Sequence, residues 1–203
     1  MKIDVLVADE NHFRYAEEIV RLMGESSSDK GTVLAVRTPE YIKDKIESHK
    51  AVIALTDKDL LAGFSYIETW SHSKFVANSG LIVAQQYRNT GLARRIKRKI
   101  FELSRQMYPY AKIFSITTNL AVMKINSELG FRPVTIASLT DDKEFWEGCR
   151  GCRNYDILLR NGYKMCLCTA LLYDPKEHPQ EKQKSGFSPI LSVGNLLKGL
   201  KLF

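Results

Sequence analysis

The sequence lacks any run of about 18 apolar residues, the minimum that a membrane-spanning helix needs. Its first ten residues, MKIDVLVADE, lack the continuous apolar core of a secretory signal peptide. We therefore expect a cytoplasmic protein without a membrane partner. The sequence also contains no internal repeat, no Gly-Lys-Ser/Thr of a Walker A loop and no GxGxxG of a dinucleotide-binding fold. These absences exclude the commonest nucleotide-binding motifs.

The charge of the chain is not balanced. Its 203 residues include 30 Lys and Arg against 23 Asp and Glu, which gives a net charge of +7 and implies an anionic partner. Most of this excess lies on one predicted helix, over residues 92–107, where six basic residues oppose one acid. No aromatic residue is interleaved among the basic residues 94–99 of that helix, and no recognised nucleic-acid motif accompanies it. A phosphorylated small molecule is therefore the expected partner, rather than a nucleic acid.

Apolar periodicity predicts the order of the elements. Strands are expected over residues 3–7, 51–56, 61–70, 75–83, 112–118 and 132–139, and helices over 13–23, 39–46, 92–107 and 120–129. This order predicts an α/β fold with a mixed, mostly antiparallel central sheet flanked by helices. We expect a core over residues 1–140, a Cys-rich extension over 141–174 that completes the sheet, and a polar linker with a short amphipathic segment over 175–203.

One strand-to-helix junction carries a signal for phosphate binding. A turn over residues 88–91 leads directly into the helix of residues 92–107. Such a junction directs free backbone N–H groups and the positive end of the helix dipole at one point. Gly91 would let the backbone approach a ligand closely, and Arg88 adds a donor suited to phosphate. The alternative is an ordinary turn in which the glycine only relieves strain.

The motif Arg88-x-x-Gly91-x-Ala93 after a strand resembles the pyrophosphate loop of the GCN5-related N-acetyltransferases, the GNAT superfamily. Asn119, Gly130 and Phe131 match the second motif of this superfamily, a helix that ends in Leu-Gly-Phe. One strand is predicted between the two motifs, as in that fold. The resemblance covers residues 3–139, about two-thirds of the chain, and the expected fold is GNAT-like.

This resemblance implies an acyltransferase that moves an acyl group from acetyl-CoA, or another acyl-CoA, to the amine of a small metabolite. Pantetheine would lie along the edge of the strand that contains Leu81, Ile82 and Val83. The loop and first helical turn would hold the pyrophosphate, through Arg88, Asn89, Thr90, Gly91, Leu92, Ala93 and Arg94. Asn119, Val122 and Asn126 would turn one helical face toward the cofactor.

Asn126 departs from the pattern of the superfamily, because many members carry a tyrosine there that protonates the departing thiolate. Asparagine cannot act as a general acid, although it can orient a water or hydrogen-bond the sulfur. The thiol of CoA has a pKa close to the 8.5 or so of free cysteine, so its thiolate needs little help to leave. Asn126 therefore leaves two alternatives open, an active enzyme without a tyrosine acid and a CoA-binding regulator without catalysis.

The acceptor amine must lose a proton before it can attack, so a base is needed. Glu68 and His72 are the candidate bases, while Asn78 and Ser79 could only relay a proton through water. Arg37 is the candidate ligand for an anionic acceptor. Residues 37–41, 74–83, 121–130 and 154–158 are similar to a group of bacterial acetyltransferases encoded with arginine-biosynthesis enzymes. This similarity implies L-glutamate as acceptor, with acetyl or succinyl as the transferred group. The sequence does not decide whether the protein forms a homodimer.

All four cysteines of the chain lie within 20 residues, as Cys149-x-x-Cys152 and Cys166-x-Cys168. This spacing resembles a structural zinc site with two thiolates from each of two turns. The alternative is that Cys166 and Cys168 are ordinary strand residues and the Cys-x-x-Cys is incidental. A nucleic-acid-binding protein that uses the basic helix and the cysteine cluster is the remaining alternative function.

Overall fold

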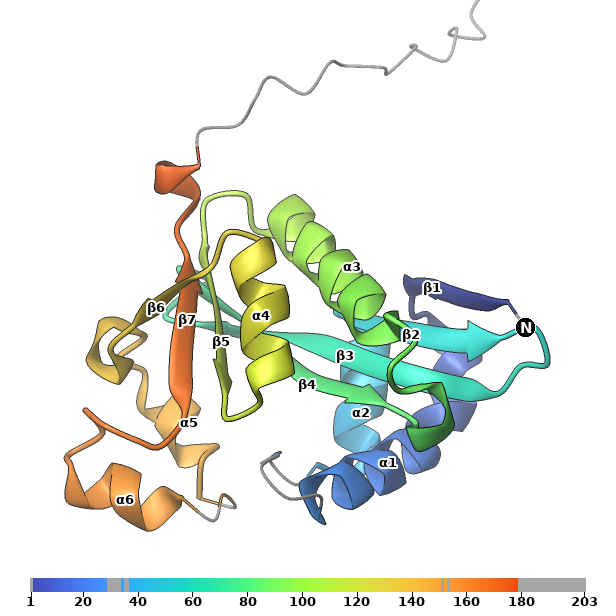
Figure 1. The fold of residues 1–203 in the computed structure, drawn as a ribbon, viewed down its shortest axis with the longest axis horizontal. Helices are drawn as coiled ribbons and strands as arrows, with labels where there is room; N and C mark the ends of the chain where they lie inside the picture. The colour runs from blue at the N-terminus through green and yellow to red at the C-terminus, as the bar shows by residue number, and fades with distance from the viewer. Residues whose placement is uncertain (1, 29–33, 35–36, 151, 153, 179–203) are drawn as a thin grey trace, which may run out of the picture.

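A computed structural model describes residues 2–28, 34, 37–150, 152 and 154–178 (Figure 1). The amphipathic segment expected near the C-terminus, together with most of the polar linker before it, lies outside the described residues. The described helices are α1 (Ala16–Ser28), α2 (Pro39–Glu47), α3 (Leu92–Met107), α4 (Leu120–Glu128), α5 (Lys143–Glu147) and α6 (Tyr155–Arg160). In this part of the chain, no helix is long and apolar enough to cross a bilayer.

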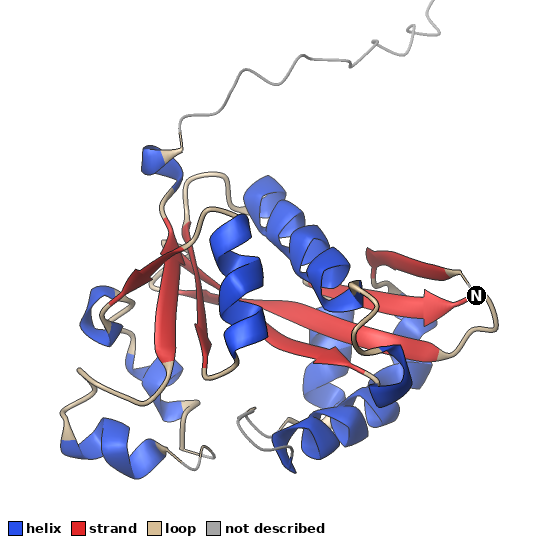
Figure 2. Cartoon of the chain, in the orientation of Figure 1, coloured by secondary structure: helices blue, strands red, loops and turns tan. Residues whose placement is uncertain are grey.

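One sheet of seven strands forms the centre of the fold, in the order β1-β2-β3-β4-β5-β7-β6. The strands are β1 (Ile3–Val7), β2 (Ala51–Thr56), β3 (Leu61–Trp70), β4 (Phe75–Val83), β5 (Lys112–Thr117), β6 (Arg132–Val134) and β7 (Thr169–Tyr173). All neighbouring pairs are antiparallel except β4 with β5. Figure 2 shows helices on both faces of this sheet, with α3 and α4 together on one of them. The expected mixed, mostly antiparallel sheet is confirmed.

Most predicted elements fall within two residues of the observed ones. The strand expected over residues 132–139 is too long, because β6 ends at Val134 and a 3-10 turn follows over Ile136–Ser138. Ile136 and Leu139 are buried against Trp146 and Leu158 instead of extending the ladder. The first helix also runs to Ser28, past the polar stretch expected to end it. Side-chain burial therefore decides where β6 ends.

Strands β4 and β5 part soon after they meet, which opens the sheet at its centre. They pair only where Phe75, Val76 and Ala77 face residues 112–114. Further along, β4 pairs only with β3, while β5 continues to pair with β7 as far as Thr117. Figure 1 shows the outcome, with β5 and β7 running across the direction of β3 and β4. The backbone edges of β4 and β5 therefore face a gap.

A bulge at Gly80 bends β4 where this gap begins. Phe64 pairs with Ile82 and Tyr66 with Ser79, so β4 holds one residue more than β3 over the same length. Gly80 has φ of 62°, and a Cβ there would lie 2.2 Å from the ring of Tyr66. Only glycine satisfies both the left-handed backbone and this close approach. The bulge therefore turns the end of β4 away from β5.

Helix α3 covers the sheet through Leu92, Ile96 and Ile100, which are all buried, as its apolar periodicity predicts. Lys97 departs from the basic surface expected for this helix, because only 1% of it is exposed. Its Nζ lies 5.4 Å from the centre of the Phe131 ring. Burial lowers the pKa of Lys97 to about 7.

Candidate active site

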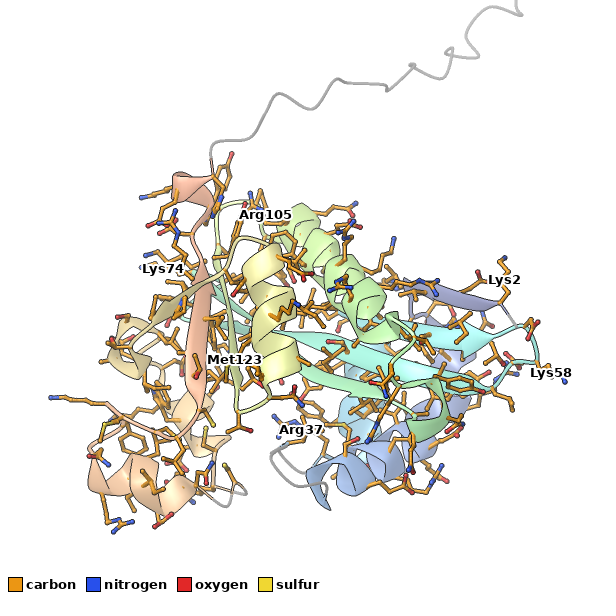
Figure 3. The ribbon with its side chains drawn as sticks, in the orientation of Figure 1. Lys2, Arg37, Lys58, Lys74, Arg105 and Met123 are labelled. Carbon is orange, nitrogen blue, oxygen red and sulfur yellow. The ribbon has the colours of Figure 1, made fainter. Side chains whose placement is uncertain are left out.

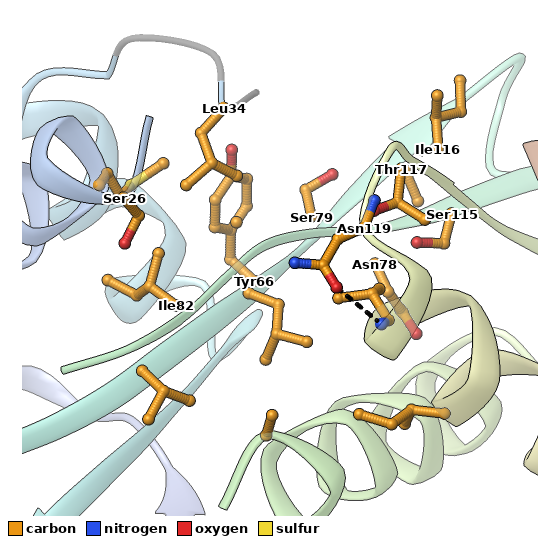
Figure 4. A pocket seen from close by; sticks show the side chains of 18 of the residues that line it. Ser26, Leu34, Tyr66, Asn78, Ser79, Ile82, Ser115, Ile116, Thr117 and Asn119 are labelled. Atoms are coloured by element: carbon orange, nitrogen blue, oxygen red, sulfur yellow. Dashed lines mark hydrogen bonds between the residues drawn. The ribbon is translucent and has the colours of Figure 1, made fainter. Parts of the chain in front are cut away.

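A cavity of about 790 Å³ occupies the gap between the parted strands. Figure 4 shows side chains from both sides of it, with Ser79 and Ile82 from β4, Ser115 and Thr117 from β5, and Asn119 at the start of α4. The cavity runs from the first turn of α3 at one end to Arg37, Glu68 and Trp70 at the other. Its two ends differ in chemistry.

The α3 end is built from backbone groups. Residues 78–83 of β4 line the cavity, and this stretch pairs with β3 but not with β5. Gly91 is the N-cap of α3 with φ of 81°, and no side chain caps the helix there. A Cβ on Gly91 would meet no described atom within 4 Å, so the glycine serves the backbone conformation and leaves the space open. Uncapped N–H groups at a helix start are a binding site for an anion.

The predicted loop residues lie at this end, with one exception. Arg88, Asn89, Gly91, Leu92, Ala93 and Arg94 all line the cavity. Thr90 does not line it, and its hydroxyl donates a hydrogen bond to the carbonyl of Tyr87 at 2.7 Å. Thr90 therefore stabilises the turn by a hydrogen bond within it. Arg88 Nε donates to the carbonyl of Val83 at 3.2 Å, which fixes the loop against the end of β4.

Asn119 and Val122, from the second predicted motif, also line the cavity. Asn119 is the N-cap of α4, and its Oδ1 accepts hydrogen bonds from the backbone N–H groups of Ala121 and Val122 at 2.9 and 3.3 Å. Its side chain is thus engaged in holding the helix start. Asparagine is one of the residues favoured at such a helix start, because its side-chain oxygen accepts from these free N–H groups.

The two remaining asparagines of the prediction lie deeper. Asn78 lines the cavity, and its Nδ2 donates to Ser104 Oγ of α3 at 2.7 Å, while its Oδ1 has no partner among the described residues. Asn126 is completely buried and does not line the cavity. Neither polar atom of its side chain has a partner in the described part of the chain. A buried, unpaired amide is costly, so its presence needs a reason.

The opposite end of the cavity is built from charged and aromatic side chains. Glu68 of β3 lines it, and its side chain is only 11% exposed. Burial raises the pKa of Glu68 to about 7, and the positive charge of Arg37 acts in the other direction. A carboxylate whose pKa lies near neutral pH is suited to accept a proton.

Arg37, labelled in Figure 3, precedes α2 and lines the same end. Its Nε donates to the hydroxyl of Tyr66 at 3.0 Å, and its guanidinium lies 4.8 Å from the centre of the Tyr41 ring. The indole Nε1 of Trp70, also at this end, is buried and has no hydrogen-bond partner among the described residues. This end therefore combines a carboxyl group, a cation and a neutral hydrogen-bond donor.

His72, the alternative base, is not brought to the cavity. It lies exposed in the turn between β3 and β4, with φ of 55°, and does not line the cavity. Sequence reasoning also missed Lys45 of α2, whose Nζ lies 3.4 Å from Oε2 of Glu68. No local pattern indicates this contact, because it depends on the packing of α2 against the sheet.

The four cysteines lie close together, near the end of the cavity that contains Arg37 and Glu68. Cys149, Cys152 and Cys168 line the large cavity, and all four cysteines line a second cavity of about 30 Å³. Cys166 and Cys168 precede β7 rather than lying within it. Burial raises the pKa of Cys149 to about 11 and that of Cys168 to about 12. Among the described residues, no three ligand side chains are arranged to hold a metal ion, so the zinc site stays a prediction.

The chain has the fold of the GNAT acetyltransferases, as its similarity to solved structures shows. It matches N-acetylglutamate synthase from Neisseria gonorrhoeae, solved with coenzyme A and N-acetyl-glutamate, with a TM-score of 0.60 and 17% identity. That match covers 86% of this chain but 35% of the synthase, so the chain spans about a third of its length.

Two further solved structures share the fold over nearly their whole length. Rv2747 from Mycobacterium tuberculosis, solved with CoA, has a TM-score of 0.60 and 14% identity, and the match covers 84% of this chain and 98% of Rv2747. Diaminobutyrate acetyltransferase EctA from Paenibacillus lautus, solved with its substrate and coenzyme A, has a TM-score of 0.57 and 12% identity, with 86% and 95% covered. No protein-family model and no curated protein matches the chain.

Proposed function

We propose that the protein is an N-acyltransferase that moves an acetyl or succinyl group from acyl-CoA to the amine of a small metabolite. One observation carries the proposal. A single cavity joins the uncapped start of α3, where a phosphate would bind, to a buried carboxylate that is able to take a proton. The GNAT fold, which structures solved with CoA share, supports it.

In this proposal, residues at one end of the cavity bind acyl-CoA and residues at the other end act on the acceptor amine. The N–H groups at the start of α3, with Arg88 and Arg94, hold the pyrophosphate, and the free edge of β4 over Leu81–Val83 hydrogen-bonds the pantetheine arm. Glu68 takes the proton from the acceptor ammonium, directly or through one water, so that the neutral amine attacks the thioester carbonyl. The CoA thiolate then leaves. Asn78 lines the cavity as a polar group able to orient a water, whereas Asn126 is buried outside the cavity lining.

For the acceptor, we propose L-glutamate, and with it a role in arginine biosynthesis. Arg37 supplies a guanidinium for a carboxylate at the base end, and the unpaired indole N–H of Trp70 supplies a neutral donor beside it. The likeness to N-acetylglutamate synthase agrees with this choice. Arg37→Ala should raise the KM for the acceptor at least tenfold and leave the KM for acyl-CoA unchanged.

The test is a panel of amino acids incubated with acetyl-CoA or succinyl-CoA, with release of free thiol as the readout. Glutamate should release thiol at rates that saturate with its concentration, and Glu68→Gln should abolish most of this release. Thiol release with other amines but not with glutamate would retain the acyltransferase and overturn the acceptor. No release with any amine would overturn the enzyme.

The alternative is a CoA-binding regulator without catalysis. The position of Asn126 favours it, because the usual tyrosine acid is replaced by a residue that does not reach the cavity. Calorimetry distinguishes the two functions. Binding of acetyl-CoA with micromolar affinity, together with no thiol release from any amine in the panel, would establish the regulator.

We also propose that the four thiols bind one structural zinc ion. They surround the same small cavity, and the backbone N–H of Asn154 donates to Cys152 Sγ at 3.4 Å, as a thiolate ligand requires. A bound cation would stabilise the thiolates that burial otherwise disfavours. Metal analysis of purified protein should give about one zinc per chain, and Cys152→Ser should lower this value. Well under one zinc per chain would overturn this proposal.

A further inference from the structure

Glu68 shares its buried position with a second cation, Lys45, which does not line the cavity. Lys45 lies on α2, and its side chain is 14% exposed. Its Nζ approaches Oε2 of Glu68 at 3.4 Å and Oδ2 of the exposed Asp44 at 3.2 Å. The side chains of Lys45 and Glu68 are therefore mostly shielded from water where they meet, unlike a surface ion pair.

The ring of Tyr41 is in contact with both cations of this region. Lys45 Nζ is 4.6 Å from its centre, and Arg37 Cζ is 4.8 Å from it. Arg37 faces the cavity and bonds the hydroxyl of Tyr66, whereas Lys45 contacts Glu68. The two cations thus differ in position, because Arg37 lines the cavity and Lys45 does not.

We propose that Lys45 is a positioning residue that holds the carboxylate of Glu68 in its ionised form and orientation, and so sets the lower pH limit of acyl transfer. The inference rests on the proposed function, in which Glu68 is the base. A carboxyl group buried to this extent favours its neutral form, and a neutral carboxyl cannot take a proton from an amine. An ammonium at 3.4 Å opposes this tendency by stabilising the charge.

Among the described residues, two cations from different segments act on Glu68, which makes their effects separable. From the segment before α2 comes Arg37, whose charge lowers the pKa of Glu68. From α2 itself comes Lys45, with Asp44 on its solvent side. Arg37 is also proposed to contact the acceptor, so its removal would change both acceptor binding and the pKa of Glu68. Lys45 does not line the cavity, so its removal tests the base alone.

The experiment compares Lys45→Met and Lys45→Arg with Lys43→Met, a matched control two residues earlier on the same helix, where the side chain is exposed. In the wild type, the plot of log(kcat/KM) against pH should change slope where Glu68 ionises. Lys45→Met should move this point up by about one pH unit and lower kcat/KM about tenfold below it. Lys45→Arg should restore most of the wild-type profile, and Lys43→Met should not differ from wild type.

A second readout does not depend on turnover. Carboxyl-¹³C NMR of protein labelled at glutamate gives the titration midpoint of Glu68, which is assigned by the signal lost in Glu68→Gln. Lys45→Met should raise this midpoint, and Lys45→Arg should not. An unchanged midpoint in folded Lys45→Met, judged by circular dichroism and by retained CoA binding, would overturn the inference. A raised midpoint in a protein that releases no thiol with any amine would retain the pairing and overturn only the proposed function.

Discussion

Arg94 forms a two-point contact with Glu128, through Nε to Oε2 at 2.7 Å and through Nη2 to Oε1 at 2.9 Å. This pair joins the first turn of α3 to the end of α4 at the rim of the cavity, and Arg94 lowers the pKa of Glu128. The same guanidinium is expected to bind a phosphate of acyl-CoA. The ion pair would therefore compete with that phosphate for Arg94.

Glu128→Gln should accordingly strengthen the binding of acyl-CoA about two- to fivefold, because it removes the competing charge. Arg94→Ala should weaken binding about tenfold, and both effects should shrink as salt is raised. Calorimetric titration with CoA measures both. A matched control is the exposed pair of Arg160 and Asp156 on α6, away from the cavity, where Asp156→Asn should leave affinity unchanged. Weaker binding in Glu128→Gln would show that the pair preorganises Arg94 instead.

We predict that binding of CoA requires Gly91, because its left-handed backbone conformation shapes the start of α3, where the phosphates are proposed to bind. Gly91→Ala forces a side chain into a left-handed conformation, which should destabilise the fold by about 1–2 kcal/mol and displace the N–H groups of the first turn. The affinity for CoA should fall more than tenfold. Urea unfolding and calorimetric titration measure the two effects.

Gly162 provides the control, because it also has a positive φ, of 56°, and open space around its Cβ position, but does not line the cavity. Gly162→Ala should lower stability by a similar amount and leave CoA affinity unchanged. If both variants bind CoA equally well, the start of α3 does not hold the phosphates.

Local patterns predicted the parts of this fold that depend on neighbours in the chain. The period of Leu92, Ile96 and Ile100 predicted α3, and the caps at Thr38 and Asn119 predicted the starts of α2 and α4. The strand-to-helix junction proposed to hold the pyrophosphate was likewise predictable as a junction, since its residues are consecutive.

Contacts between distant segments were not predictable in this way. Lys45 and Glu68 meet because α2 packs against the sheet, and no spacing along the sequence records that packing. Lys97 looked like one member of a basic surface, yet it falls on the side of α3 that faces Phe131. His72 was a second candidate base beside Glu68, and only the structure shows that the turn between β3 and β4 exposes it to solvent.

Glu68 should determine how the rate depends on pH. With its pKa raised to about 7, the carboxyl binds a proton below neutral pH and cannot then act as a base. The slope of log(kcat/KM) should therefore decrease by one near pH 7 as pH rises, in addition to the effect of amine ionisation. Glu68→Gln should remove this change of slope and lower kcat about 10²- to 10⁴-fold. His72→Gln should behave as wild type, and loss of activity in that variant would restore His72 as the base.

Lys97 should make the stability of the fold depend on pH. Burial lowers its pKa to about 7, whereas the unfolded chain holds this proton up to a pH of about 10.4. Between these values the unfolded state binds more protons, so stability should rise with pH, and below pH 7 the penalty should be complete. Lys97→Met removes the ionisable group and should be more stable than wild type at pH 6. The difference between the two should narrow by up to about 4 kcal/mol at pH 10.

Urea unfolding at pH 6, 7, 8, 9 and 10 measures this difference in free energy directly. Lys43→Met, which removes an exposed helical lysine, is the control, and its difference from wild type should stay nearly constant over the same range. Subtracting the control removes contributions common to any lost surface charge. A constant difference between wild type and Lys97→Met would mean that the ammonium of Lys97 reaches water in solution, and that α3 and the Phe131 segment separate enough to let it do so.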